Sequence, residues 1–390
     1  MKTHIGVIFG GRSVEHEVSV ISALQVIHAI DTERFDVVPI YIAKEGDWYS
    51  GDALMTLENY KDVDALKKHC SRVVPTSEGG RLLLLRNPPA RFGKNIIAEV
   101  DVVFPVTHGT YGEDGCLQGL LEMLDVPYVG CDVTASALGM DKIRFKEIGK
   151  ARALPMVEYL WFFSKSWHTD PKPIRQQVCD QIGYPLIVKP ANLGSSIGVA
   201  VVTTEDALDE AVALAASFAD RVIVEKLVPN VLEINCAVIG DQDEATASVC
   251  EEPLHSAEFL SYAEKYQTKG GSTKGMESVK RRIPADISQE WAQTIQDLAC
   301  KTFSAIGANG VARIDFLINR DTGDIFVNEI NTIPGSMAFY LWTPSNLAFA
   351  ELIGKLVKLA LKRSRERSAL LRANPVNILA LSSKGGGAKL

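Results

Sequence analysis

Two apolar segments in the C-terminal third of the sequence carry charged side chains whose types and spacing could do chemistry. Residues 310–318 read GVARIDFLI and residues 325–331 read IFVNEIN. Residues 319–324 between them (NRDTGD) are typical of a turn, so the two segments are expected to pair as an antiparallel hairpin. Since strand side chains alternate between faces, the hairpin then has one polar face and one apolar face.

The polar face of this hairpin gathers four functional side chains. With the turn centred in the linker, Asp315 lies opposite Glu329 and Arg313 lies opposite Asn331. Two carboxylates and an amide oxygen form a hard, all-oxygen set suited to Mg²⁺ bound together with phosphate oxygens. The alternative is a solvated strand face with a surface ion pair. The following Pro-Gly turn favours a site, because it could direct the N–H of Gly335 at a substrate oxygen.

Residues 187–198 (IVKPANLGSSIG) are typical of a loop that folds over phosphate. A strand delivers Lys189 into a glycine- and serine-rich loop that offers backbone N–H and hydroxyl donors. It is not a Walker loop, because no Gly-Lys-Ser/Thr follows, and Gly10-Gly11 lacks the GxGxxG spacing of a dinucleotide-binding turn. Taken alone, the segment is equally well explained as a plain tight turn.

The elements that must position these residues alternate between strand and helix in the first third of the chain. Strands and helices are expected to alternate over residues 5–9, 18–30, 37–42, 100–105 and 115–124. This alternation predicts a parallel sheet covered by helices. Residues 45–95 are weakly periodic and give no prediction.

The rest of the chain is predicted to form compact α+β units. In the central part, helices and strands are expected over residues 142–151, 170–181, 186–189, 199–203 and 205–219. Beyond it, besides the hairpin, they are expected over residues 222–225, 234–239, 289–306 and 346–363. The predicted domains are an N-terminal α/β domain over 1–130, a central subdomain over 131–221, a C-terminal domain over 222–372 and a disordered tail over 373–390.

Composition restricts the partners and the compartment. The 390 residues carry a net charge of -7, which gives no electrostatic footprint for nucleic acid and would repel an anionic membrane. The 7 cysteines are dispersed without a CxxC pair, as expected for free thiols in a reducing compartment. No signal peptide and no apolar run of the ~18 residues needed to span a membrane are found. The sequence therefore predicts a cytoplasmic protein.

Several short motifs occur in the order found in the ATP-grasp ligases, and the chain most resembles the D-alanine–D-alanine ligase family. The motifs are GGRSVEHEVS (10–19), HGTYGEDG (108–115), MDK (140–142), KPANLGSSIG (189–198), EK (225–226), EKY (264–266), RID (313–315) and NEINTIPG (328–335). Together they span most of the chain. The resemblance implies a three-domain ATP-grasp architecture, with ATP between the central and C-terminal domains.

The resemblance also implies how ATP and metal would be held. Lys142 and Lys189 would neutralise the phosphates. Glu225, the backbone near Leu227 and Glu233 would contact adenine and ribose, although the spacing from Glu225 to Glu233 is slightly longer than usual. The hairpin residues Asp315, Glu329 and Asn331 would hold two Mg²⁺ ions, for which Mn²⁺ could substitute.

For catalysis, the resemblance implies that Glu15 receives the ammonium of the donor amino acid, in a hydrogen-bonded triad with Ser195 and Tyr266. The alternative for Glu15 is a carboxylate at a helix N-terminus, where the helix dipole favours it. Arg313 and the N–H of Gly335 would stabilise the oxyanion of the tetrahedral intermediate, an interaction typically worth ~3 kcal/mol.

Residues 262–276 carry lysines among glycines, and they are expected to form either a solvated basic loop or a mobile lid. A lid would bring Lys265 to the γ-phosphate and keep water from the acyl phosphate. The family match at Lys265 and Tyr266 favours the lid.

The acceptor side is where the sequence leaves the family pattern. Similar ligases have Met-Thr after Pro-Gly and a serine a few residues later, whereas this chain has Ser336 followed by Phe339 and Tyr340 in that region. The two aromatic residues could be core packing or could reshape the acceptor pocket. His108 could lie near the acceptor or be a structural histidine.

The expected function is the ATP-dependent joining of two D-alanines through an acyl phosphate, as a step in peptidoglycan precursor synthesis. One alternative is a divergent ATP-grasp ligase with D-serine, D-lactate or another small amine as acceptor. The other is a non-catalytic ATP-binding regulator, which would have no need of the oxyanion arrangement. The expected partners are small amino acids, and similar enzymes are commonly homodimers.

Overall fold

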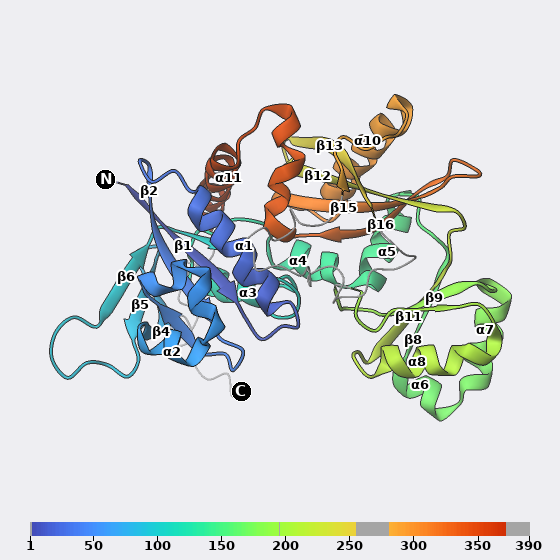
Figure 1. Ribbon diagram of the computed structural model, residues 1–390, viewed down its shortest axis with the longest axis horizontal. Helices are drawn as coiled ribbons and strands as arrows, with labels where there is room; N and C mark the ends of the chain where they lie inside the picture. Colours follow the sequence, from blue (N-terminus) through green and yellow to red (C-terminus); the bar gives the residue numbers. More distant parts are fainter. Residues whose placement is uncertain (1, 195, 255–280, 372–390) are drawn as a thin grey trace, which may run out of the picture.

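The computed structural model describes residues 2–194, 196–254 and 281–371. Within these ranges the backbone forms sheets of seven, four and five strands. The seven-stranded sheet lies at one end of the molecule and the four-stranded sheet at the other, with the five-stranded sheet between and above them (Figure 1). The predictions for Ser195, for Lys265, Tyr266 and residues 262–276, and for the tail 373–390 fall outside the described residues.

The N-terminal sheet has the predicted parallel centre. Strand β1 (Thr3–Gly10) pairs in parallel with β2 (Phe35–Ile42) and with β7 (Val102–Pro105). Helix α1 (His16–Ala29) packs on this sheet in one hydrophobic cluster. Helix α3 (Cys116–Met123) packs on the same sheet in a second hydrophobic cluster. These elements confirm the α/β prediction for the first third of the chain.

Residues 45–95, whose weak periodicity supported no prediction, extend this sheet on one side. They contain β3 (Trp48–Ser50), 3₁₀ turns at Asp52–Met55 and Leu57–Lys61, α2 (Val63–Lys68), β4 (Ser71–Glu78) and β5 (Arg81–Arg86), and β6 (Ile96–Val100) follows. Each of these strands pairs antiparallel with the next, and β3 pairs antiparallel with β2. The sheet is therefore mixed, with a parallel centre and an antiparallel edge.

The four-stranded sheet is antiparallel. Its strands lie in the order β10 (Ala200–Val202), β9 (Leu186–Pro190), β11 (Arg221–Lys226) and β8 (Tyr159–Phe163). Helices α6 (Ser164–Thr169), α7 (Pro171–Gln181) and α8 (Leu208–Ala216) pack on it, and a 3₁₀ turn (Glu205–Ala207) precedes α8.

The expected boundary between residues 221 and 222 divides this sheet. The strand predicted to open the C-terminal domain is β11, and it pairs with both β8 and β9. An apolar strand pattern does not indicate which partners the strand will have. The strand β11 thus belongs by its pairing to the four-stranded sheet, and the domain boundary stays a prediction.

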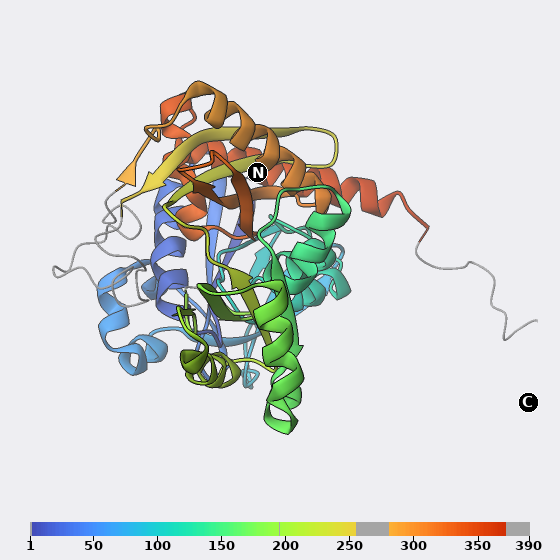
Figure 2. The ribbon, with the colours of Figure 1, turned by 90° about the vertical axis from the view of Figure 1, so that its right-hand side faces the viewer.

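The five-stranded sheet carries the predicted hairpin. Its strands lie in the order β14 (Arg281–Arg282), β13 (Ala245–Pro253), β12 (Val231–Gly240), β15 (Gly310–Asn319) and β16 (Ile325–Asn331). Helix α10 (Gln289–Ala305) lies across one face of it (Figure 2). Helix α4 (Val133–Met140) packs beside β16, and α5 (Lys142–Ala151), which has the predicted bounds, follows it.

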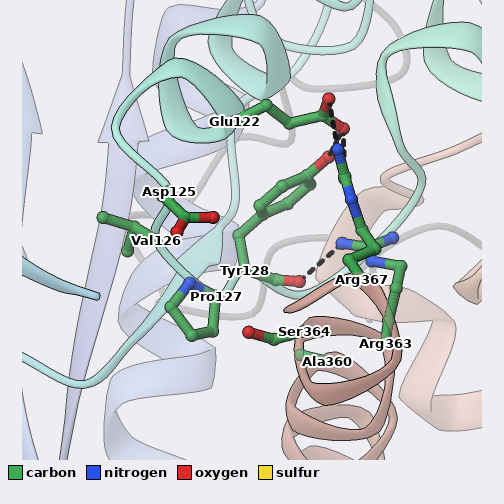
Figure 3. Close-up of a pocket in the computed structure, with 9 residues that line it drawn as sticks. All are labelled: Glu122, Asp125, Val126, Pro127, Tyr128, Ala360, Arg363, Ser364 and Arg367. Carbon is green, nitrogen blue, oxygen red and sulfur yellow. Dashed lines mark hydrogen bonds and ion pairs between the residues drawn. The ribbon is translucent and has the colours of Figure 1, made fainter. Parts of the chain in front are cut away.

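Helix α11 (Phe349–Ser368) packs between the five-stranded sheet and the N-terminal unit. It begins later than expected, because 3₁₀ turns at Gly335–Leu341 and Thr343–Ser345 precede it. It also ends later than expected. Its last turns are bonded to the N-terminal unit (Figure 3). Arg367 donates to both oxygens of Glu122 at 2.6 and 2.8 Å, and Arg363 donates to the carbonyls of Gly130 and Tyr128 at 2.5 and 2.8 Å.

Replacing Glu122 with glutamine is expected to lower the free energy of unfolding by about 1–2 kcal/mol near neutral pH, because the guanidinium fork of Arg367 loses its charged acceptor. The hydrogen bonds from Arg367 lower the pKa of Glu122 from 4.5 to about 2. A lowered pKa means that the stabilisation is complete above the unfolded-state pKa and is lost as the pH falls toward the folded-state value. Urea unfolding should therefore show a smaller difference between native and variant chains at about pH 3 than at about pH 7.

The matched control is Glu366→Gln on the same helix, because this exposed carboxylate lies 3.9 Å from Lys362 and makes no comparable fork. It is expected to change the unfolding free energy by less than about 0.5 kcal/mol. Equal losses for Glu122→Gln and Glu366→Gln would contradict a specific role of the Arg367 pair.

Candidate functional site

One cavity of about 260 Å³ lies where the three sheets meet. Most of the residues predicted from the sequence line it. They are Glu15, His108, Lys142, Lys189, Leu227, Glu233, Arg313, Asp315, Glu329, Asn331 and Gly335. Glu225, Ser336, Phe339 and Tyr340 do not line this cavity. Side chains separated by more than 300 positions thus share one site of the size typical of small-molecule pockets.

The β15–β16 hairpin has the predicted register. Arg313 pairs with Asn331 and Asp315 pairs with Glu329. Immediately after Asp315 the register shifts by one residue, so that Phe316 pairs with Val327. The functional pairs lie on the cavity side of this bulge, which is a common device for directing side chains at a site.

The four side chains of the hairpin are tightly connected. Arg313 donates from Nε and Nη2 to the two carboxylate oxygens of Asp315, both at 2.7 Å, and Asn331 Nδ2 donates to Asp315 Oδ2 at 3.0 Å. Burial raises the pKa of Asp315, Arg313 works against it, and the charges of Glu329 and Glu251 raise it further. A bound cation would relieve this repulsion between carboxylates.

The donor set fits Mg²⁺ only together with a ligand. Within the described ranges no group of three or more His, Cys, Asp or Glu side chains is arranged to hold a metal ion. Asp315 and Glu329 supply two carboxylates and Asn331 an amide oxygen, so the remaining oxygens would come from phosphate and water. Magnesium commonly binds in this way, through one or two carboxylates and substrate phosphates.

Two lysines from outside the hairpin also line the cavity. Lys142 is the first residue of α5, whose N-terminus is capped by Asp141 through hydrogen bonds from the N–H groups of the next turn. Its Nζ lies 3.2 Å from Glu329 Oε2 and donates to the carbonyl of Leu193 at 3.0 Å. Lys189, at the end of β9, donates to Glu225 Oε2 at 2.9 Å.

Glu15 is the N-cap residue of α1, but its side chain makes no capping hydrogen bond to the helix. It is buried and lines the cavity. A Cβ atom at Gly194 would lie 2.9 Å from Glu15 Oε2, and one at Gly109 would lie 2.6 Å from it. Two glycine loops therefore approach this carboxylate more closely than any side chain would permit.

His108 is a buried histidine at the cavity wall. Its Nε2 lies 3.2 Å from the hydroxyl of Ser22, and its Nδ1 lies 4.0 Å from Glu113 Oε2. Burial lowers the pKa of His108 to about 4, so the ring is neutral near pH 7. The same Ser22 hydroxyl accepts from the N–H of Ser336 at 3.1 Å, which connects the histidine to the loop after Gly335.

Glu113 is a site residue that the sequence reasoning did not single out, although it lies within the HGTYGEDG motif. It accepts hydrogen bonds from the N–H groups of Gly109 and Ile333, both at 2.9 Å. Burial, with the charge of Glu15, raises the pKa of Glu113 to about 8. By holding Ile333, this carboxyl group fixes the backbone two residues before Gly335.

The segment after Gly335 is packed rather than open. Phe339 stacks on Phe349 with ring centroids 4.4 Å apart, so it belongs to the core. Tyr340 lies under the guanidinium of Arg281 at 4.0 Å. Ser336 is buried and has a φ of 52°, and the next two residues are also left-handed, a conformation that costs non-glycine residues about 1–2 kcal/mol each. Of the two alternatives for Phe339, the structure favours core packing.

Two further charged residues near the site were not predicted. Lys146, on α5, is fully buried beside Glu225. Glu251, on β13, lines the cavity and lies 3.2 Å from Asn235 Nδ2. Neither residue belongs to a recognisable motif, because its helix or strand carries other charged residues as well. Only the packing of elements that are distant in the sequence brings each of them to the site.

A cavity between antiparallel sheets, lined both by lysines and by an acidic hairpin, defines the chain as an ATP-grasp enzyme. The family profiles described as "D-ala D-ala ligase N-terminus" and "D-ala D-ala ligase C-terminus" match residues 4–131 and 148–358. The chain belongs to the D-alanine–D-alanine ligase family.

Individual relatives agree with this assignment over nearly the full length. The D-alanine–D-alanine ligase of Thermosipho melanesiensis is 38% identical over 365 residues, which are 93% of this chain and 95% of the relative. The structure of the D-alanine–D-alanine ligase from Coxiella burnetii has a TM-score of 0.80 at 28% identity, covering 98% of this chain and 99% of that one. The VanG D-Ala:D-Ser ligase from Enterococcus faecalis has a TM-score of 0.76 at 33% identity, covering 92% and 100%.

Among residues 2–194, 196–254 and 281–371, no helix is both long enough and apolar enough to cross a membrane.

Proposed function

We propose that the chain is an ATP- and Mg²⁺-dependent ligase that joins two D-alanines, as a cytoplasmic step in peptidoglycan precursor synthesis. The observation that carries the proposal is one cavity in which Glu15 at the start of α1, Lys189 on β9 and the Arg313–Asp315 pair on β15 come together. Family membership over nearly the whole chain supports the same reaction.

The first step is phosphoryl transfer to the donor amino acid. Glu15 binds the donor ammonium, and a donor carboxylate oxygen attacks the γ-phosphorus of ATP, breaking its bond to the bridging oxygen and releasing ADP. Lys142 and Lys189 neutralise the phosphates, and Asp315, Glu329 and Asn331 hold Mg²⁺. When bound, the metal spreads the charge of the transferring phosphoryl group, which is most of the help this step needs.

The second step is attack of the acceptor amine on the acyl phosphate. The acceptor ammonium first gives a proton to solvent, its nitrogen then attacks the carbonyl carbon, and the carbonyl oxygen becomes an oxyanion. Arg313 and the N–H of Gly335 stabilise that charge, and the C–O bond to phosphate then breaks to leave the dipeptide and inorganic phosphate. Preorganised donors of this kind act strongly because the site is partly closed to water.

The remaining residue roles are supported by family resemblance. Leu227 and Glu233 line the cavity where adenine and ribose would lie. Glu225 does not line it, and both of its oxygens face lysines, so its proposed contact to adenine would require Lys189 to turn away. Ser195, Lys265 and Tyr266, outside the described residues, are proposed as triad and lid residues.

A second candidate function is ligation of D-alanine to D-serine. The observation that favours it is the similarity to the D-Ala:D-Ser ligase structure, together with the departure from the family pattern after Gly335. D-Alanine remains the primary acceptor in the proposal, because the curated relatives at 37–38% identity are named D-alanine–D-alanine ligases. A homodimer is proposed by resemblance to similar enzymes.

The test is a substrate panel. The full chain is incubated with ATP, Mg²⁺ and D-alanine, alone or paired with D-serine, D-lactate or L-amino acids, and phosphate release and product mass are measured. D-Alanyl-D-alanine as the main product supports the proposal, and a mixed dipeptide formed in preference to it supports the second candidate. ATP binding with no condensation product from any pair would overturn both.

A further inference from the structure

Helix α5 carries three lysines on one side, Lys142, Lys146 and Lys150, and only Lys142 lines the cavity. Lys142 and Lys146 are four residues apart, so their side chains leave the same face of the helix. Lys142 lines the cavity, whereas Lys146 does not and its side chain is only 1% exposed. A lysine that is buried to this degree requires a counter-charge.

The counter-charge of Lys146 is Glu225 on β11. The helix packs on the four-stranded sheet through Ile143, Ala191 and Ile223, which form a small buried cluster. Beside this cluster the Nζ of Lys146 lies 3.3 Å from Glu225 Oε1. Nothing in this contact resembles a solvated surface pair, since the Glu225 side chain is 2% exposed.

Glu225 holds a second lysine with its other oxygen. In the β9–β11 register Ile223 is opposite Lys189, so Glu225, two residues further on, shares a sheet face with that lysine. Its Oε2 accepts from Lys189 Nζ at 2.9 Å. Burial alone would raise the pKa of Glu225, but Lys146 and Lys189 together lower it to about 2.

Two lysines share the Glu225 carboxylate. The lysine on the cavity side, Lys189, also feels the charges of Glu233 and Glu329. If Lys146 were absent, Lys189 would be the one remaining cation beside the buried Glu225 among the residues that the structure describes. Drawing Lys189 toward a ligand would then leave the Glu225 carboxylate without that partner, which is strongly unfavourable for a buried charge.

We propose that Lys146 is a positioning residue for the phosphate groups of the nucleotide. It neutralises Glu225 from the side away from the cavity, so that the charge of Lys189 stays available to a polyphosphate. The inference rests on the proposed function for the identity of the ligand, and it adds a residue that does not touch the ligand.

The test measures nucleotide binding by calorimetry on the full chain without amino acids. Lys146→Met removes the charge and keeps the straight side chain, and it is expected to weaken ATP binding about tenfold, as for the loss of one partly screened charge interaction. Adenosine, which has no phosphate, is measured by competition and is expected to bind as it does to the native chain. Lys150→Met is the matched control, because Lys150 is exposed on the same helix over the same Tyr159 ring, and it is expected to bind ATP normally.

A double variant separates charge from packing. In Lys146→Met/Glu225→Gln the carboxylate that competes for Lys189 is gone, so the ATP affinity of the double variant should equal that of Glu225→Gln alone, which already includes any loss of the proposed adenine contact. If Lys146→Met alone does not fold, Glu225→Gln is compared with the double variant, and equal ATP affinities support the inference. Unchanged ATP binding in Lys146→Met, or equal losses for ATP and adenosine, would overturn it. ATP binding by the native chain without ligation would instead overturn the proposed function.

Discussion

Replacing Arg313 with alanine is expected to lower the rate of dipeptide formation by about 100- to 1,000-fold, the usual cost of removing one oxyanion donor. The reason is its position. The guanidinium lines the cavity, is oriented by two 2.7 Å hydrogen bonds to Asp315, and lies across the hairpin from Asn331. The neighbouring Asp315 carboxylate raises the Arg313 pKa well above its usual value despite burial, so the group stays charged throughout.

The measurement that isolates this role compares turnover with nucleotide affinity. ATP binding is expected to stay within about threefold of the native chain, because a group that acts in the transition state lowers kcat without weakening ground-state binding. Arg313→Lys is the companion variant, since it keeps the charge but loses the forked guanidinium that bonds both oxygens of Asp315. Its turnover should lie between that of the native chain and that of Arg313→Ala. Equal losses of ATP affinity and of turnover would contradict the oxyanion role. Thermal unfolding of each variant excludes loss of the fold.

The hairpin could be predicted from the sequence because all of its information is local. The turn residues between the two strands set the centre of the pairing, and the period of two then fixes which side chains share a face. Asp315 opposite Glu329 and Arg313 opposite Asn331 follow from that count, and the structure has the same pairs. Only the one-residue bulge after Asp315 was not foreseen, and it leaves those pairs unchanged.

Features set by contacts between distant segments could not be predicted in this way. The strand β11 was correctly recognised, but its partners β8 and β9 come from other parts of the chain, and they decide the unit to which it belongs. Residues 45–95 gave no clear pattern because their short strands add to the edge of an existing sheet. The burial of Lys146 could not be predicted for the same reason. A lysine in a helix is normally solvated, and only the packing of α5 on the sheet buries this one.

Replacing Glu329 with glutamine is expected to lower turnover by at least about 100-fold at a fixed Mg²⁺ concentration, because a bound metal ion supplies several kcal/mol of charge stabilisation to phosphoryl transfer. Glu329 is the cleaner of the two carboxylates to change. The substitution Asp315→Asn would leave the Arg313 guanidinium buried without its charged partner, which would destabilise the fold as well as the site. Glu329 pairs with Lys142 near the open part of the cavity, and its side chain is 33% exposed.

The signature of a metal ligand is a shift in the metal dependence, which a merely structural change would not produce. In Glu329→Gln, ADP release should require a higher Mg²⁺ concentration, and Mn²⁺ binding in the presence of ADP, followed by electron paramagnetic resonance, should weaken in parallel. Asp324→Asn in the turn of the same hairpin is the control, because this exposed carboxylate accepts a hydrogen bond from the neighbouring Thr322 hydroxyl at 2.6 Å and lies outside the cavity. A Glu329→Gln chain that loses turnover with an unshifted Mg²⁺ curve and native Mn²⁺ binding would show that Glu329 acts through Lys142 alone. In that case Asp315 and Asn331 would have to hold the metal without it.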